Sequence, residues 1–215
     1  MKLLLLDAAG ILVAFVLGAL VFFFGGLFGG PYLMLILTFL VFSVVATKYR
    51  SDMKRKLALY EYNRGWENVV ANGIVPVLCV VAAYLLREPE VGIWAYVGSL
   101  AAVTADKFSS EIGVLGEAPR KLFSFELAKR GESGAISLLG SLASFNGALV
   151  IGIASYYLFP GRYDAWGVLA ICVIGVFGGF VDSVFGIFEN SGVGNKMTTN
   201  IICALTGAML GRLFL

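Results

Sequence analysis

The run AWGVLAICVIGVFGGFVDSVFGIF, residues 165–188, decides the class of fold. A helix needs about 20 mostly apolar residues to cross a bilayer, and this run carries a single charged side chain, Asp182. Similar runs recur along the chain, which is 59% apolar and 14% charged, against about 25% charged in an ordinary soluble domain. The sequence therefore predicts an all-α, polytopic transmembrane helical bundle that forms a single integral-membrane domain over residues 1–215.

About seven spans are expected, at residues 3–25, 31–47, 67–86, 91–113, 134–159, 165–188 and 198–215. The second is short and follows a glycine-rich turn, so six spans is the alternative. With seven, thirteen of the sixteen Lys and Arg residues lie on the side of the N-terminus, which the positive-inside rule assigns to the cytoplasm. The first apolar run has no evident cleavage site, and the lack of a Ser- and Arg-rich transit segment favours a prokaryotic plasma membrane.

Composition also excludes several classes of function. The net charge of +2 is too small to indicate nucleic acid binding. Histidine is absent, so imidazole catalysis and His-ligated zinc are excluded, and acid–base or metal chemistry must use Asp and Glu. The three cysteines lie in apolar segments without metal-ligand spacing, which is typical of small core residues.

Acidic side chains gather where two predicted spans end on the cytoplasmic side. Asp106 and Glu111 lie at the end of the fourth span, and Asp182 lies toward the end of the sixth. Asp106 shares a helical face with Ser109 and Ser110, whereas Glu111 is about 140° away and is either a ligand or a group that orients a loop residue. A Mg²⁺ site typically uses one or two carboxylates plus substrate phosphates. Asp106, Asp182 and Glu111 are therefore the candidate catalytic residues and metal ligands.

A basic, glycine-containing loop separates the fourth span from the fifth. It carries Lys121, Lys129 and Arg130, and its turn at 131–134 precedes a predicted helix start, where free N–H groups can bind phosphate. The turn lacks the Gly-Lys-Ser/Thr of a P-loop. The other candidate residues for binding nucleotide or substrate are Arg64, Asn68, Asn72, Ser110, Ser133, Asn195, Lys196 and Asn200.

Structural explanations stay open for several of these residues. Asp182 could pair with Lys107 or Lys196 merely to hold the bundle together, although a carboxylate in a membrane costs on the order of 3 kcal/mol. Asp106 could be an interfacial residue at a helix end. The basic cluster at 48–56 is interpreted as a cytoplasmic loop that contacts anionic lipid.

Four blocks of sequence carry a resemblance: ENVVANG at 67–73, ADKFSSEIG at 105–113, GESGAISLLG at 131–140 and GFVDSVFG at 179–186. Together they are similar to an integral-membrane family, long known only as a domain of unknown function, that includes the phytyl-phosphate kinase of plant tocopherol synthesis. The likeness covers nearly the whole chain. The Asp-containing block, the basic loop and the Gly-rich helix start are more distantly similar to dolichol kinases and phosphatidate cytidylyltransferases, both of which use CTP.

The resemblance implies a membrane phosphotransferase. It would be an isoprenoid monophosphate kinase that makes phytyl or geranylgeranyl diphosphate with Mg²⁺ and a nucleoside triphosphate, CTP being suspected. Asp106 and Asp182 would hold the ion, with Glu111 a ligand or an orienting group. Basic residues of the loop would neutralise triphosphate oxygens. Arg64, Asn72 and Asn200 would bind the acceptor phosphate or polar parts of the nucleotide.

The expected partners are the lipid bilayer and a prenyl phosphate, with no nucleic acid and with the active site facing the cytoplasm. A homodimer is compatible with the sequence. The alternatives are a kinase of the free prenyl alcohol, a cytidylyltransferase-type lipid enzyme, or a transporter of isoprenoid phosphates.

Overall fold

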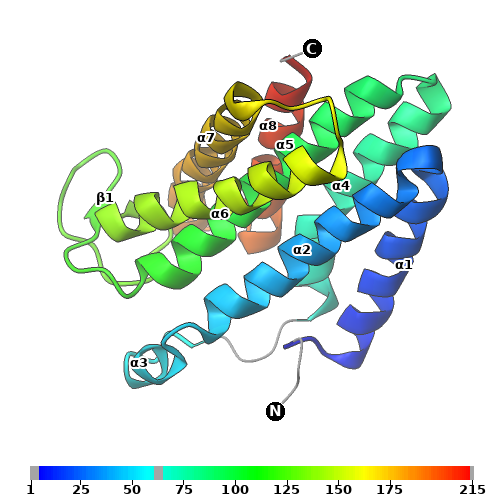
Figure 1. Ribbon diagram of the computed structural model, residues 1–215. Coiled ribbons are helices and arrows are strands. Elements are labelled where there is room, and N and C mark those ends of the chain that lie inside the picture. Colours follow the sequence, from blue (N-terminus) through cyan, green and yellow to red (C-terminus); the bar gives the residue numbers. More distant parts are fainter. Residues whose placement is uncertain (1–4, 61–64, 214–215) are drawn as a thin grey trace.

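The computed structural model describes residues 5–60 and 65–213. Within these residues the protein is a bundle of eight α-helices with one 3-10 turn and one two-stranded ribbon (Figure 1). In chain order the elements are α1 (Ala8–Phe24), η1 (Gly26–Phe28), α2 (Gly29–Lys48), α3 (Ser51–Lys56), α4 (Trp66–Leu86), α5 (Pro89–Gly113), β1 (Arg120–Lys121), β2 (Ala135–Ile136), α6 (Leu138–Leu158), α7 (Ala165–Asn190) and α8 (Lys196–Leu213).

Each predicted span overlaps one long helix, so the all-helical membrane bundle is confirmed. Among the described residues, four helical segments are long and apolar enough to cross a membrane: Gly26–Lys48, Trp66–Leu86, Leu138–Leu158 and Ala165–Glu189. Helix α1 is apolar but shorter, and α5 carries several charged residues. The number of seven spans and the cytoplasmic N-terminus stay predictions.

Helix α5 is the centre of the bundle. It packs against α2, α4, α6, α7 and α8, and its residues from Gly92 to Phe108 are buried almost without a break. This enclosure explains how α5 can carry polar groups such as Ser99 and Thr104, which are fully buried. The other helices keep these groups away from lipid, where polar groups are costly.

Glycine allows α8 to lie directly against α5. A Cβ atom placed on Gly207 would collide with the carbonyl oxygen of Gly98, and one on Gly98 would collide with that of Gly207. A Cβ on Gly211 would strike the carbonyl oxygen of Trp94 one turn away. Small residues commonly let membrane helices approach closely in this way.

A buried lysine joins the short helix α3 to the bundle. The Lys54 side chain is fully buried, and its Nζ donates to the carbonyl oxygens of Ala46 (2.8 Å) and Thr47 (2.9 Å) and to Glu111 Oε2 (3.0 Å). Glu111 Oε1 accepts from Thr47 Oγ1 (2.7 Å) and pairs with Lys107 Nζ (2.9 Å). We call this set the Glu111 clamp. The expected lipid-contacting role of the 48–56 cluster is therefore wrong for Lys54, which completes the end of α2.

The fifth predicted span begins too early. Residues 135–136 form β2, which pairs antiparallel with β1 in the register Arg120–Ile136 and Lys121–Ala135. Helix α6 starts at Leu138, and the Ser137 hydroxyl caps it by accepting from the Gly140 N–H at 3.0 Å. The strand and α3 lie at the same end of the bundle (Figure 1), which we call the polar end.

Replacing Gly207 with Ala should destabilise the protein by roughly 1–3 kcal/mol, because the new methyl group meets backbone rather than a side chain that can move. The measurement is the midpoint of thermal unfolding in detergent. Gly30→Ala is the matched control, since a Cβ there meets nothing within 4 Å. Equal midpoints for the two variants would contradict the close packing of α5 and α8.

Lys54→Met should cost about 3 kcal/mol, because it leaves the Glu111 carboxylate buried with one cation fewer. Lys56→Met, on the exposed side of the same short helix, should be nearly neutral. A double-mutant cycle with Glu111→Gln, followed by thermal unfolding, isolates the coupling. Additive effects of Lys54→Met and Glu111→Gln would show that the pair does not stabilise the protein.

Candidate functional site

A polar cavity of about 390 Å³ opens at the polar end of the bundle. Helices α5 and α7 form its floor, and the starts of α6 and α8 together with the segment 130–137 form its walls. Its lining residues are Leu59, Asp106, Ser109, Ser110, Gly113, Val114, Pro119, Arg130, Gly131, Glu132, Ser133, Gly134, Ala135, Ser137, Gly140, Asp182, Ser183, Gly186, Glu189 and Lys196.

Two carboxyl groups meet in the floor of this cavity. Asp106 on α5 and Asp182 on α7 are 7% and 5% exposed, and their side chains are close enough to interact directly. They can approach because α7 has Gly178 and Gly179 where it crosses α5. A Cβ on Gly178 would collide with Ala102, and one on Gly179 would lie 3.5 Å from the backbone nitrogen of Asp106.

Lys196 forms a salt bridge with one member of this pair. Its Nζ lies 2.8 Å from Asp182 Oδ2. The structure therefore contains the Asp182–Lys196 pair, which is a structural explanation for Asp182 that the sequence left open. The other oxygen, Asp182 Oδ1, is buried with no hydrogen-bond partner within the described ranges, and the same holds for Glu189 Oε2. The salt bridge therefore uses only part of the acceptor capacity of the site.

The turn at 131–134 forms one wall. Gly131 and Gly134 have φ angles of +78° and +77°, which glycine adopts without strain. A Cβ on Gly134 would lie 2.6 Å from Cγ1 of Ile187 on α7. The turn is thereby held against α7 and presents Arg130 and Ser133 to the cavity.

Helix N-termini face the same space. Ser137 and Gly140, in the first turn of α6, line the cavity, and so does Lys196 at the start of α8. Gly113 and Gly140 bring the end of α5 against the start of α6, since a Cβ on Gly113 would lie 2.9 Å from the Gly140 Cα. The Gly140 N–H already donates to the Ser137 hydroxyl. The helix dipole and the other N–H groups of the first turn favour an anion at such positions.

Six of the predicted site residues come together in this cavity, namely Asp106, Ser110, Arg130, Ser133, Asp182 and Lys196. Glu111 does not line it: both of its oxygens are engaged in the Glu111 clamp. The contacts therefore favour the orienting role that the sequence left open for this residue.

The other predicted residues lie elsewhere. Lys121 is half-exposed beside Glu126 (3.6 Å), and Lys129 is exposed on the loop. Asn195 Oδ1 accepts from the Thr198 N–H (3.0 Å) in the first turn of α8. Three further residues are outside the cavity: Asn68 and Asn72 on α4 line a second cavity, and Asn200 pairs with Asn72. Arg64, the remaining candidate, lies outside the described residues.

Sequence reasoning missed some of the lining. Glu132, Ser137 and Ser183 face the cavity, although only their neighbours Ser133 and Asp182 were singled out. Ser183 follows Asp182 directly and gave no separate signal. The positions of Glu132 and Ser137 depend on the ribbon and on the true start of α6, which the apolar pattern did not reveal.

The cavity suits a cation that is shared with a ligand. No set of three or more His, Cys, Asp and Glu side chains within the described part of the chain could hold a metal alone. However, Asp106, Glu132, Asp182 and Glu189 outnumber the basic residues Arg130 and Lys196 in the lining. This excess of negative charge, with an unpartnered Asp182 Oδ1, fits a Mg²⁺ ion that takes its remaining ligands from phosphates and water.

Comparison with known proteins places the chain in a family. Residues 1–207 match the family described as integral membrane protein DUF92. The chain is 34% identical over 209 residues to the uncharacterized membrane protein MJ0933 of Methanocaldococcus jannaschii, which covers 96% of this chain and 84% of that protein. Protein PGR of Arabidopsis thaliana is 30% identical over 178 residues, 74% of this chain and 59% of that protein.

The membrane protein sll0875 of Synechocystis sp. is 30% identical over 150 residues, which cover 66% of this chain and 57% of that protein. No solved structure matches the protein significantly. The chain therefore belongs to the DUF92 family of integral membrane proteins.

Proposed function

We propose that the protein is a membrane phosphotransferase that converts an isoprenoid monophosphate to the diphosphate with a nucleoside triphosphate, CTP being the first candidate. The observation that carries this proposal is the Asp106–Asp182 pair, which faces two helix N-termini and a glycine turn inside one polar cavity. Carboxylates for a cation and N–H groups for phosphate are the parts that phosphoryl transfer needs.

In the proposed reaction an oxygen of the acceptor monophosphate attacks the γ-phosphorus of the nucleotide, and the nucleoside diphosphate leaves. The acceptor oxygen is already ionised near neutral pH, so no strong general base is required. A chain without histidine can therefore perform this chemistry. Its task is to position two phosphorylated molecules and to balance their negative charge.

The cavity divides this task among its residues. Arg130, Lys196 and the N–H groups at the start of α6 would bind phosphate oxygens and stabilise the charge that develops during transfer. Asp106 and Asp182 would hold Mg²⁺, which neutralises charge on the triphosphate. Glu111 would act from outside the cavity. It pairs with Lys107, which is next to Asp106 in the chain, and with Lys54 of helix α3.

The position of the cavity is also consistent with an enzyme for a membrane lipid. Its lining residues belong to the polar end of the bundle, where a soluble nucleotide and a lipid headgroup can meet. Substrate sites of many transporters lie near the middle of the membrane instead. The localisation that follows is an integral membrane enzyme with its site at one membrane face, which we infer to be the cytoplasmic face.

Asp106→Asn and Asp182→Asn should each lower the rate of prenyl diphosphate formation by about 10²–10³-fold, because each removes charge that the cation requires. The assay uses purified protein, Mg²⁺, geranylgeranyl or phytyl monophosphate and each of the four nucleoside triphosphates. Glu117→Gln, an exposed carboxylate at the same end that does not line the cavity, is the control.

The product decides among related activities. A nucleoside diphosphate with a prenyl diphosphate supports the kinase, pyrophosphate with a cytidylyl lipid indicates a cytidylyltransferase, and turnover of the free alcohol indicates an alcohol kinase. Absence of turnover with every nucleotide, in protein that unfolds cooperatively, would refute the phosphotransferase. Full activity in both Asp variants would support the phosphotransferase activity but show that Asp106 and Asp182 do not form its site.

CTP and Mg²⁺ together should raise the unfolding midpoint more than the sum of their separate effects, because the acidic cavity accepts the triphosphate only with its cation. At a nucleotide concentration of 100 times Kd the stabilisation is about 2.7 kcal/mol. The measurement is thermal unfolding in detergent, and Asp182→Asn should abolish the joint effect. Equal stabilisation by CTP without Mg²⁺ would contradict the shared cation.

A further inference from the structure

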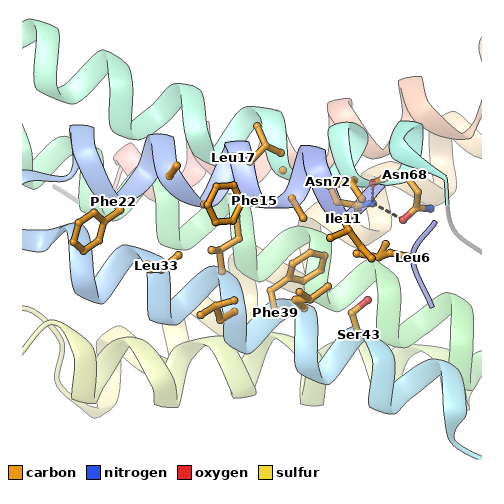
Figure 2. A pocket seen from close by; sticks show the side chains of 18 of the residues that line it. Leu6, Ile11, Phe15, Leu17, Phe22, Leu33, Phe39, Ser43, Asn68 and Asn72 are labelled. Carbon is orange, nitrogen blue, oxygen red and sulfur yellow. Dashed lines mark hydrogen bonds between the residues drawn. The ribbon is translucent and has the colours of Figure 1, made fainter. Parts of the chain in front are cut away.

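A second cavity of about 540 Å³ lies between α1, α2 and the start of α4 (Figure 2). Its walls are formed by apolar side chains of the three helices, among them Phe15, Phe22, Leu33 and Phe39. The volume falls within the range of about 300–1,000 Å³ that is usual for ligand sites. The activity proposed above assigns nothing to this groove.

The groove is long and open to the membrane along α1. Its lining on α1 runs from Ile11 to Phe23, a rise of about 18 Å at 1.5 Å per residue. Ile11, Phe15 and Phe23 are 51%, 75% and 75% exposed. In an integral membrane protein such side chains face hydrocarbon, so the groove is continuous with the lipid-facing surface and a single long apolar chain can enter from the side.

Polar groups occupy only one end of the groove. Ser43, Asn68 and Asn72 lie together there, while Phe22 marks the opposite end (Figure 2). The polar groups come from the end of α2 and the start of α4, so they lie toward the polar end of the bundle. The groove therefore fits a molecule with an apolar chain and a polar head in one fixed orientation.

Two asparagines link this end to the polar cavity. Asn200 Nδ2 on α8 donates to Asn72 Oδ1 at 3.4 Å, and Asn200 lies one helical turn from Lys196, which pairs with Asp182. Asn200 is 5% exposed, and its Oδ1 has no hydrogen-bond partner among the residues that the structure describes. A polar contact thus joins α4, which lines the groove, to α8, which carries Lys196 of the polar cavity.

We propose that the groove binds the isoprenoid chain of the phosphorylated substrate, with its phosphate end directed past Asn72 and Asn200 toward the polar cavity. This inference rests on the proposed function and names the site that selects its lipid. A glycerophospholipid is a poorer occupant, because its two chains would have to share a cavity of about 540 Å³.

The test uses geranylgeranyl monophosphate with a diazirine near the end of its chain, photolysed with the whole protein in detergent without nucleotide. Mass spectrometry should place the label on α1 and α2, near Phe22 or Leu33. Unlabelled geranylgeranyl monophosphate should compete, and dioleoyl phosphatidic acid should not. Label spread over the lipid-facing sides of α6 and α7, or equal competition by phosphatidic acid, would overturn the proposal.

A variant that fills the groove provides a second measurement. Ala14→Trp places a large side chain in the groove, whereas Val16→Trp places it on an exposed part of α1 outside the lining. We expect Ala14→Trp to reduce labelling and to raise KM for geranylgeranyl monophosphate at least tenfold. A short acceptor such as dimethylallyl monophosphate should keep its KM. Equal labelling and KM in the two variants would refute the groove.

The two proposals fail in distinguishable ways. Labelling of α1 and α2 does not need turnover, so labelled protein that makes no prenyl diphosphate would discard the kinase and keep the lipid site. Prenyl diphosphate formation with label elsewhere would keep the kinase and discard the groove. If Ala14→Trp does not fold, the label map of the unaltered protein still decides the question.

Discussion

The structure depends on keeping the charges of α5 out of lipid. This helix carries Asp106, Lys107 and Glu111 within two turns, and hydrocarbon accepts such groups only at a cost of about 3 kcal/mol each. Five other helices therefore enclose α5. They can pack around it because glycine stands at the contacts, as at Gly207 against Gly98 and Gly178 against Ala102. Part of the high glycine content of the chain is a consequence of this enclosure.

Enclosure also separates the charges of α5 into two groups with different surroundings. The Glu111 carboxylate is surrounded by Lys54, Lys107 and Thr47, so its charge is balanced within the protein. Asp106 instead faces Asp182, another carboxylate, across the cavity floor. Like charges in contact require a cation or a proton, and Lys196 supplies part of this compensation. The first group holds helices together, and the second is the candidate site.

Sequence alone indicated much of this organisation. Apolar runs located every long helix because hydrocarbon requires them, and helical spacing placed Asp106, Ser109 and Ser110 on the face that lines the cavity. Contacts between distant segments could not be predicted. Lys54 looked like its basic neighbours, yet its side chain is buried and turns inward to Glu111, and nothing local pairs Asn72 with Asn200. The start of α6 was predicted too early because the apolar run begins before the helix does. The helix itself starts after Ser137, whose hydroxyl caps it.

The depth of the cavity floor has a consequence for lipid access. Asp106 lies seven residues before the end of α5 at Gly113, and Asp182 lies eight before the end of α7 at Asn190, so both carboxylates are about 10–12 Å below the helix ends. A bilayer of about 40–45 Å has a hydrocarbon core of about 30 Å, which leaves a headgroup layer of several ångströms on each side. Helices that end at the water surface would therefore hold the carboxylates a few ångströms below that layer, at the edge of the hydrocarbon core. The phosphate of the prenyl substrate proposed above would therefore move inward to the carboxylates while its chain remains in the membrane, and the lipid would not have to be extracted.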